Sequence, residues 1–144
     1  MALHVARWAE RTLGEHEPPL TVAQYLVLEA LAHGVDAPGA LARNAGVSSA
    51  AVSQLLRELE RAALVERSLA PEDRRRHRLA LTPAGRAVYA SATELVAQRL
   101  AGPLGRLPPP DVGRLAEALT GVAEAVAAAP PPPPRPRPRR HPPP

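Results

Sequence analysis

The densest run of positive charge in the foldable part of the sequence spans five residues. It consists of Arg74, Arg75, Arg76, His77 and Arg78. Clustered guanidinium groups neutralise phosphates, and the negative potential of a narrow minor groove attracts single arginines. An exposed loop or a local ion pair with Asp73 would explain the same run. We expect the four arginines to contact DNA, Arg74 and Arg75 foremost.

A second set of polar residues repeats along one face of a predicted helix. It consists of Ser49, Ser53, Gln54 and Arg57, and Ser48 directly precedes it. A glutamine can form two hydrogen bonds with adenine, and an arginine can bind guanine or phosphate. A solvated helix face is the alternative explanation. Because an arginine-rich run follows in the sequence, we expect these five residues to form a DNA-contact surface.

The residues around this polar set predict two short helices joined by a tight turn. Pro38 suits the first position of a helix that runs to about Ala45, and Gly46 can adopt the left-handed conformation of the turn. The buried side of the second helix consists of Val52, Leu55, Leu56 and Leu59. Ser48 can cap this helix. The layout is that of a helix-turn-helix, whose second helix enters the major groove.

The apolar spacing changes to a period of two after Leu64. Residues 65–69 and 78–81 alternate between apolar and polar side chains, which predicts two strands of a β-hairpin. The segment Ala70–Arg76 begins its turn with a proline and ends in cations. The sequence therefore predicts a wing beside the reading helix, with the arginines at its tip.

Further helices are predicted on both sides of this unit. Their expected ranges are 3–14, 21–33, 83–102 and 111–128. Thr21 and Gln24 form a capping box, and Thr82 is an N-cap followed by a first-turn proline. The third of these helices should end or kink at Gly102–Pro103, where glycine precedes proline. Residues 130–144, rich in proline and arginine, are expected to be a disordered tail.

Composition limits the remaining classes of protein. A chain of 144 residues fits one domain, and its net charge of +4 equals that of the four tail arginines alone. The absence of cysteine excludes disulfides and thiol switches. No apolar run approaches the ~20 residues that span a bilayer, so we expect a soluble, cytoplasmic protein. The five histidines lack the spacing of a metal site, and we expect no metal and no cofactor.

Several segments, in this order and at these separations, resemble the MarR family of transcriptional regulators. They are Leu41–Ser48, Val52–Glu60, Leu64–Arg67, Pro71–Arg76 and Leu81–Arg86. The resemblance covers about residues 3–128. It implies a mainly α fold with a small β wing, in which a winged helix-turn-helix is flanked by N- and C-terminal dimerisation helices.

The resemblance also implies partners. Family members pair through helices near both termini, here about residues 3–14 and 83–128, around a DNA-reading lobe at about 20–82. They commonly bind effectors between the dimerisation layer and this lobe. An acidic residue at the position of Asp73 orients a neighbouring arginine of the wing. Trp8 and Tyr25 could line an effector cavity, although an aromatic residue on a helix is more often part of the core.

The sequence and the resemblance together therefore predict a homodimeric regulator that binds a pseudo-palindromic operator in duplex DNA. We expect a repressor that a small-molecule effector releases. The alternative is a winged-helix interaction scaffold that binds partners through the Pro/Arg-rich tail. No enzyme is expected, because the sequence has no phosphate-binding glycine loop, nucleophile elbow or metal cluster.

Overall fold

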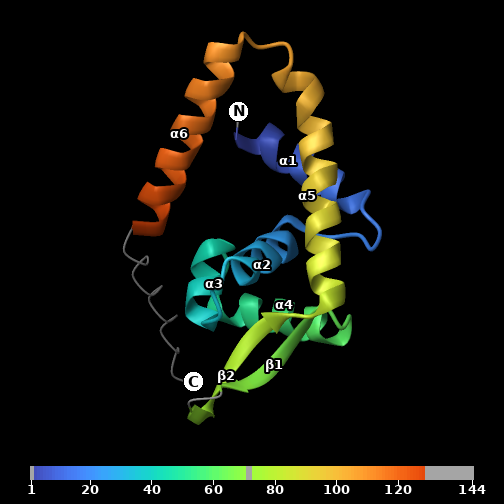
Figure 1. Cartoon of the computed structure of the whole chain (residues 1–144), viewed down its shortest axis with the longest axis vertical. Helices are drawn as coiled ribbons and strands as arrows, with labels where there is room; N and C mark the ends of the chain where they lie inside the picture. Colours follow the sequence, from blue (N-terminus) through green and yellow to red (C-terminus); the bar gives the residue numbers. More distant parts are fainter. Residues whose placement is uncertain (1, 71–72, 129–144) are drawn as a thin grey trace, which may run out of the picture.

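A computed structural model of the chain describes residues 2–70 and 73–128, and the side chains of residues 4–68 and 78–121. Over these residues it has six helices and a two-stranded sheet (Figure 1). The elements are α1 (Ala2–Gly14), α2 (Val22–Ala32), α3 (Pro38–Asn44), α4 (Ser49–Arg61), β1 (Val65–Ala70), β2 (Asp73–Leu81), α5 (Pro83–Leu104) and α6 (Pro109–Ala128). The predicted mainly α fold with a small β wing is confirmed. The expected tail, 130–144, lies outside the described residues.

Side-chain caps start the helices where the sequence places them. Thr21 and Gln24 form the complete capping box at the start of α2. The hydroxyl of Ser48 accepts from the amide of Ala51 at the start of α4, and that of Thr82 accepts from the amide of Gly85 at the start of α5. Each cap satisfies an amide that has no partner within its helix, which fixes where the helix begins.

Left-handed residues end α2, α3 and α4. Gly34 has a φ of 82° and Gly46 a φ of 64°, as expected for the turns after α2 and α3. After α4 the left-handed residue is Ala63, which follows the C-cap residue Ala62 and has a φ of 55°. An alanine in this conformation costs about 1–2 kcal/mol relative to its right-handed form. Nothing in the sequence indicated a left-handed turn at Ala63.

One hydrophobic core holds the end of α1, α2, α3, α4, the sheet and the middle of α5 together. Its most deeply buried large side chains are Leu13, Val27, Leu28, Leu41, Val52, Leu56 and Leu59. The α4 residues in this set are those that the helical spacing assigned to the core, and Leu55 packs against the same cluster while partly exposed. Because the core lies on one side of α4, the other side of that helix faces outward.

The wing is longer than its alternating pattern predicts. The strands pair antiparallel from Val65 opposite Leu81 to Leu69 opposite His77, and an irregularity then places Ala70 opposite Asp73. The expectation that Ala70–Arg76 forms the turn is therefore wrong: β1 includes Ala70, and β2 begins at Asp73. β2 includes the arginine run, where no apolar alternation indicates a strand, and the pairing passes from His77 to Asp73 across the irregularity.

The C-terminal helices extend away from this core. In Figure 1, α5 runs from the wing to the far end of the molecule, where the chain turns into α6, and α6 then stands apart from α1 to α5. The expected break at Gly102–Pro103 lies inside α5, which continues to Leu104 with Pro103 in its last turn. Because proline has no N–H to donate to the carbonyl oxygen four residues earlier, Pro103 removes one helical hydrogen bond close to the end of α5.

A buried histidine joins the segment between α1 and α2 to α5. The Nδ1 of His16 donates to the carbonyl oxygen of Pro18 at 2.8 Å, and its Nε2 lies 2.8 Å from the hydroxyl oxygen of Ser91. Beside it, Arg99 forms an ion pair with Glu15. These contacts attach the end of α1 to the middle of α5.

Candidate nucleic-acid interface

The outward face of α4 consists of polar side chains above a buried apolar side. Ser49, Ser53, Gln54 and Arg57 are exposed, whereas Val52, Leu56 and Leu59 on the opposite side are at most 2% exposed. Burial of the apolar side fixes the rotation of the helix about its axis. The expected contact residues of α4 therefore share one solvent-facing surface, which is the geometry that a helix entering the major groove requires.

Two of the serines on this surface also serve the helix itself. The Ser48 hydroxyl accepts the amide of Ala51 at 3.2 Å, and the Ser53 hydroxyl donates to the carbonyl oxygen of Ser49 at 2.8 Å. With its proton engaged, the Ser53 oxygen is left as an acceptor. The hydrogen-bond donors that extend farthest from this face are the side chains of Gln54 and Arg57, which are longer than those of the serines.

Gln54 and Arg57 are held together. The Nη2 of Arg57 donates to Oε1 of Gln54 at 2.6 Å, and the Nε2 of Gln54 donates to Oε1 of Glu58 at 2.8 Å. Both residues were predicted to contact DNA, but their mutual contact and the role of Glu58 were not. The i, i+3 and i, i+4 spacings allow such contacts, yet do not select them among the possible partners.

The wing projects beside α4 (Figure 1). The side chains of Asp73, Arg74, Arg75 and Arg76 lie outside the described part, so their predicted roles concern residues known here only by their place in β2. Arg78 is described: it is exposed, and its Nε lies 3.7 Å from Oδ2 of Asp36 in the segment between α2 and α3. The wing is thus linked through an exposed ion pair to the start of the helix-turn-helix.

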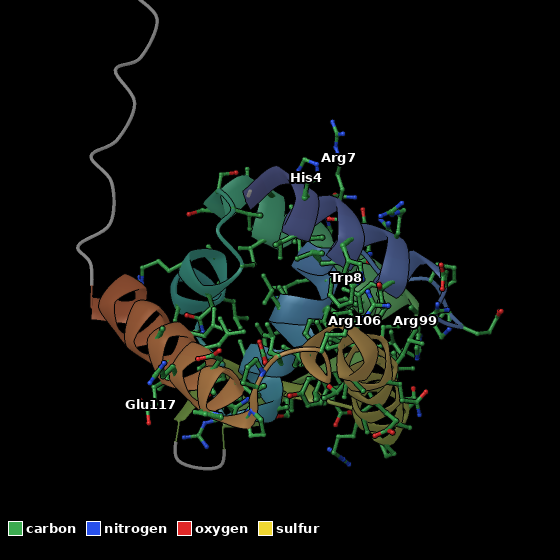
Figure 2. All side chains as sticks on the ribbon, turned by 90° about the horizontal axis from the view of Figure 1, so that it is seen from above. His4, Arg7, Trp8, Arg99, Arg106 and Glu117 are labelled. Atoms are coloured by element: carbon green, nitrogen blue, oxygen red, sulfur yellow. The ribbon has the colours of Figure 1, made fainter. Side chains whose placement is uncertain are left out.

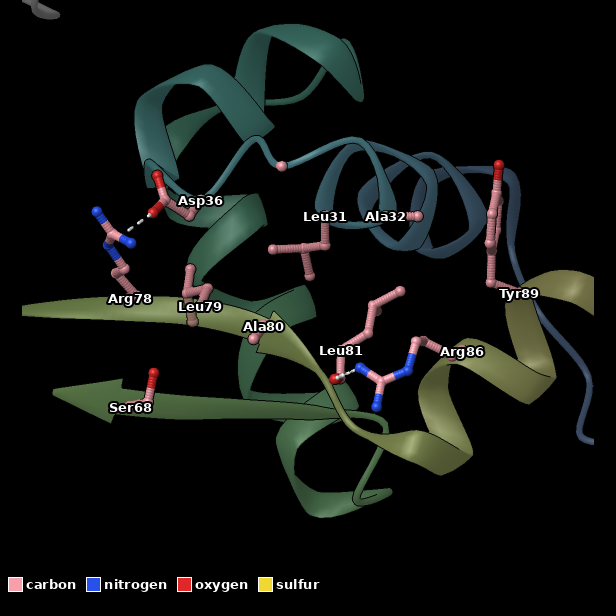
Figure 3. Close-up of a pocket in the computed structure, with 11 residues that line it drawn as sticks. Leu31, Ala32, Asp36, Ser68, Arg78, Leu79, Ala80, Leu81, Arg86 and Tyr89 are labelled. Carbon is pink, nitrogen blue, oxygen red and sulfur yellow. Dashed lines mark hydrogen bonds and ion pairs between the residues drawn. The ribbon is translucent and has the colours of Figure 1, made fainter. Parts of the chain in front are cut away.

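A hollow of about 560 Å³ lies between the end of α2, the wing and the start of α5. Figure 3 shows Arg78 and Asp36 at one end of it, Arg86 and Tyr89 at the other, and Leu31 between them. Arg86 donates through Nη1 to the carbonyl oxygen of Leu81 at 2.7 Å. Apolar walls with guanidinium groups at two edges can receive an amphipathic anion. The sequence did not predict this hollow, because its walls come from three distant segments.

The two aromatic residues expected near an effector do not line this hollow. Tyr25 packs on Tyr89, with ring centroids 5.8 Å apart, and its hydroxyl is hydrogen-bonded to Thr93 at 3.1 Å. Burial raises the pKa of the Tyr25 phenol. Trp8 is half-buried and lies on the side of α1 that faces α5, whereas His4 and Arg7 point outward (Figure 2). Tyr25 therefore contacts Tyr89, which lines the hollow, but does not line the hollow itself.

No group of three His, Asp or Glu side chains among the described residues could hold a metal ion. None of the helices in the described ranges is both long and apolar enough to cross a membrane.

Comparison with known proteins agrees with this arrangement. The sequence model described as MarR family matches residues 19–76, which run from before α2 into the wing. Transcriptional regulator HosA of Escherichia coli O111:H- is 37% identical over 94 residues, which are 62% of this chain. The chain spans 63% of the length of HosA in that match.

Solved structures extend the likeness to most of the chain. Wild-type MarR from E. coli is 28% identical, with a TM-score of 0.64 over 84% of this chain and 93% of that one. CouR from Rhodococcus jostii RHA1, solved with p-coumaroyl-CoA bound, is 25% identical, with a TM-score of 0.69 over 85% of each chain. The expectation that the chain is not an enzyme agrees with HosA, which is a transcriptional regulator. On sequence and fold together, the chain is similar to the MarR family of transcriptional regulators, by sequence from before α2 into the wing and by fold over most of its length.

Proposed function

We propose that the chain is a sequence-specific regulator that binds duplex DNA as a homodimer, with α4 in the major groove and the wing arginines on the backbone or in the minor groove. The observation that supports it most is the exposed face of α4, on which Ser49, Ser53, Gln54 and Arg57 lie together. Such a face supplies donors and acceptors for base edges. The arginines of the wing supply charge for phosphate.

Exposed apolar residues near both termini support the homodimer. On α6, Leu115 is 40% and Leu119 is 60% exposed, and on α1 Val5 is 61% exposed. Leu107, in the turn between α5 and α6, is exposed as well. A second copy packed against these helices would remove the apolar surface from water. A two-fold dimer presents two reading helices, so the operator should have two related half-sites about one helical turn apart.

DNA selection followed by titration tests the proposal. Random duplexes retained by the purified full chain are sequenced, and the selected duplex and a scrambled one are then titrated at several salt concentrations. Loss of an arginine that contacts phosphate should weaken binding to both duplexes and make the salt slope shallower by about one unit, which we expect for Arg75→Ala. Gln54→Ala should instead relax the preference at one position of each half-site.

A matched control is available on α6. Arg114 is exposed and pairs with Asp111 three residues earlier, far from the wing, so Arg114→Ala removes one charge without touching the proposed surface. It should leave preference unchanged and affect the salt slope less than Arg75→Ala. If selection enriches no sequence, DNA recognition is rejected, and the interaction scaffold that binds through the Pro/Arg-rich tail becomes the better explanation.

We further propose that the regulator is a repressor released by a small amphipathic acid bound in the 560 Å³ hollow. Support comes from the two arginines at its edges and from its contact with both the wing and the start of α5. CouR provides a precedent for an acyl-CoA ligand in a family member. A ligand that engages Arg78 would compete with Asp36 and could thereby shift the wing relative to α3.

Release by ligand is measured on the protein–operator complex. Aromatic carboxylic acids and their thioesters, including p-coumaroyl-CoA, are added while binding is followed by fluorescence anisotropy. Ala80→Leu places a larger side chain in the hollow and should abolish release while operator affinity persists. Ala87→Leu, on an exposed position of α5 outside the hollow, should respond as the parent does. Release that persists in Ala80→Leu would place the effector elsewhere, for example near Trp8 and Tyr25.

A further inference from the structure

Glu58 lies next to the proposed reading face of α4 but has the wrong charge for a phosphate contact. It is half-buried, and its Oε1 accepts the Nε2 of Gln54 at 2.8 Å. Among the described ion pairs, none joins Glu58 to Arg57 or Arg61 on the same helix, so these arginines do not neutralise it directly. A carboxylate here opposes DNA binding electrostatically. Its presence therefore needs an explanation other than phosphate contact.

The contact with Glu58 gives the Gln54 amide one orientation. An ionised carboxylate can only accept hydrogen bonds, and a guanidinium can only donate them. The NH₂ of Gln54 must therefore face Glu58, and its Oε1 must face Nη2 of Arg57, at 2.6 Å. A flipped amide would place donor against donor and acceptor against acceptor. One N–H and one lone pair of Gln54 remain, and these are the groups that a glutamine uses toward N7 and N6 of adenine.

Glu58 is itself held from a second helix. Its Oε2 accepts the Nε2 of Gln24 in α2 at 3.4 Å. The Oε1 of Gln24 accepts the backbone amide of Thr21 at 3.0 Å in the capping box, which fixes the orientation of that amide too. Each oxygen of Glu58 thus has one donor, and the two donors belong to different helices. The position of Glu58 depends on how α2 packs against α4, and not on α4 alone.

We propose that Glu58 is a positioning residue for DNA specificity, which orients Gln54, and through it Arg57, toward the base edges. The proposal rests on the proposed DNA-binding function of α4. In this role Glu58 does not contact DNA. It lowers general affinity through its charge and raises the preference for the correct base by keeping Gln54 in one of its two amide orientations.

The test compares base preference and general affinity in Glu58→Gln. The side chain keeps its shape but offers one acceptor in place of two, so one of the two glutamines that face it loses its partner. We expect preference at the position read by Gln54 to fall by about 5- to 150-fold, the range of one bidentate base contact. Affinity for scrambled DNA should stay the same or rise, because a negative charge is removed.

Glu60→Gln is the matched control on the same helix. It removes the same charge, but Glu60 pairs with Arg67 of β1 and does not contact Gln54. General affinity should change as in Glu58→Gln, with base preference kept. Glu58→Asp retains the charge but shortens the side chain, and should lose preference without the gain in general affinity. Thermal unfolding of each variant shows whether the fold is retained.

A double variant separates positioning from a merely structural role. If Glu58 acts through Gln54, Glu58→Gln should change no base preference in the Gln54→Ala background. A further loss of preference in that background would overturn the proposal, as would an unchanged preference in Glu58→Gln alone. If the parent selects a DNA sequence but Gln54→Ala reads it equally well, the positioning role fails while DNA binding stands. If the parent selects no sequence, both proposals fail.

Discussion

Gly85 lies directly against the backbone of Leu64. A Cβ at residue 85 would be 1.9 Å from the carbonyl oxygen of Leu64 and 2.9 Å from its carbonyl carbon. The same carbonyl oxygen accepts the amide of Thr82 at 3.1 Å, and the hydroxyl of Thr82 donates to the carbonyl oxygen of Ala63 at 2.7 Å. The first turn of α5 is therefore fixed to the turn between α4 and β1, which places the reading helix and the wing relative to the long helix.

Gly85→Ala should lower the free energy of unfolding by about 3 kcal/mol, because the backbone must move to admit one methyl group. Gly39→Ala in α3 is the control, since only the end of the Arg43 side chain, at 3.8 Å, is near the added carbon. That change should alter stability by less than about 1 kcal/mol. Urea unfolding of both variants provides the comparison, and equal effects would contradict the close approach.

Exchanging alanine and glycine should have opposite effects on the free energy of unfolding at the two left-handed residues Ala63 and Gly46. Ala63→Gly relieves an unfavourable φ and should raise the free energy of unfolding by about 0.5 kcal/mol, after allowance for a more flexible unfolded chain. Gly46→Ala should lower it by about 1 kcal/mol, although the space around Gly46 is open. Denaturant midpoints at constant m-value report both. Destabilisation by Ala63→Gly would show that this residue is not held left-handed in solution.

His16 and Ser91 should be energetically coupled. Ser91→Ala removes the partner of a buried ring nitrogen and should cost about 1–2 kcal/mol of unfolding free energy. His16→Ala should cost more, because the bond to Pro18 and the packing of the ring are also lost. The double variant should lose less than the sum of the two single changes, by about 0.5–1.5 kcal/mol. Strict additivity in this double-mutant cycle would show that the contact contributes no stability.

Stability should fall at alkaline pH in part through Tyr25. Burial raises the pKa of this phenol above its ordinary value of 10.0 in the folded state, so folding favours the protonated form. This contribution is complete below about pH 10 and is lost as the pH rises through the higher folded-state pKa. The free energy of unfolding should thus decrease above pH 10, and less steeply in Tyr25→Phe. Parallel pH profiles for parent and variant would rule the effect out.

Charge on the exposed apolar side of α6 should dissociate the proposed dimer. Leu115 and Leu119 lie one turn apart, and a glutamate at either position would be buried without a partner in a dimer interface. Leu119→Glu should therefore reduce the mass measured by light scattering at micromolar concentration from two chains to one. Gly121→Glu adds the same charge on a side of the helix turned away from both leucines, and should remain dimeric. A parent that has the mass of one chain would refute the dimer itself.

Local chemistry in the sequence was sufficient to predict most of the helix boundaries. Thr21, Ser48 and Thr82 each act through an amide three residues away, and Gly46 acts through its own φ angle, so their effects need no distant partner. The same holds for the buried side of α4, whose apolar spacing alone determines which face must turn inward. The exposed polar face, and with it the candidate reading residues, follows from that orientation.

Features that join distant segments were decided only by the tertiary structure. The hydrogen bond from Gln24 to Glu58 spans 34 residues, and the approach of Gly85 to Leu64 exists only because α5 packs on the turn after α4. Neither helix propensity nor apolar periodicity predicts such pairs, since each residue taken alone suits its own helix. The hollow beside Arg86 arises in the same way from α2, β2 and α5. The amino-acid sequence alone therefore specified which residues face outward, whereas packing between helices determined which of them touch and in what orientation they are held.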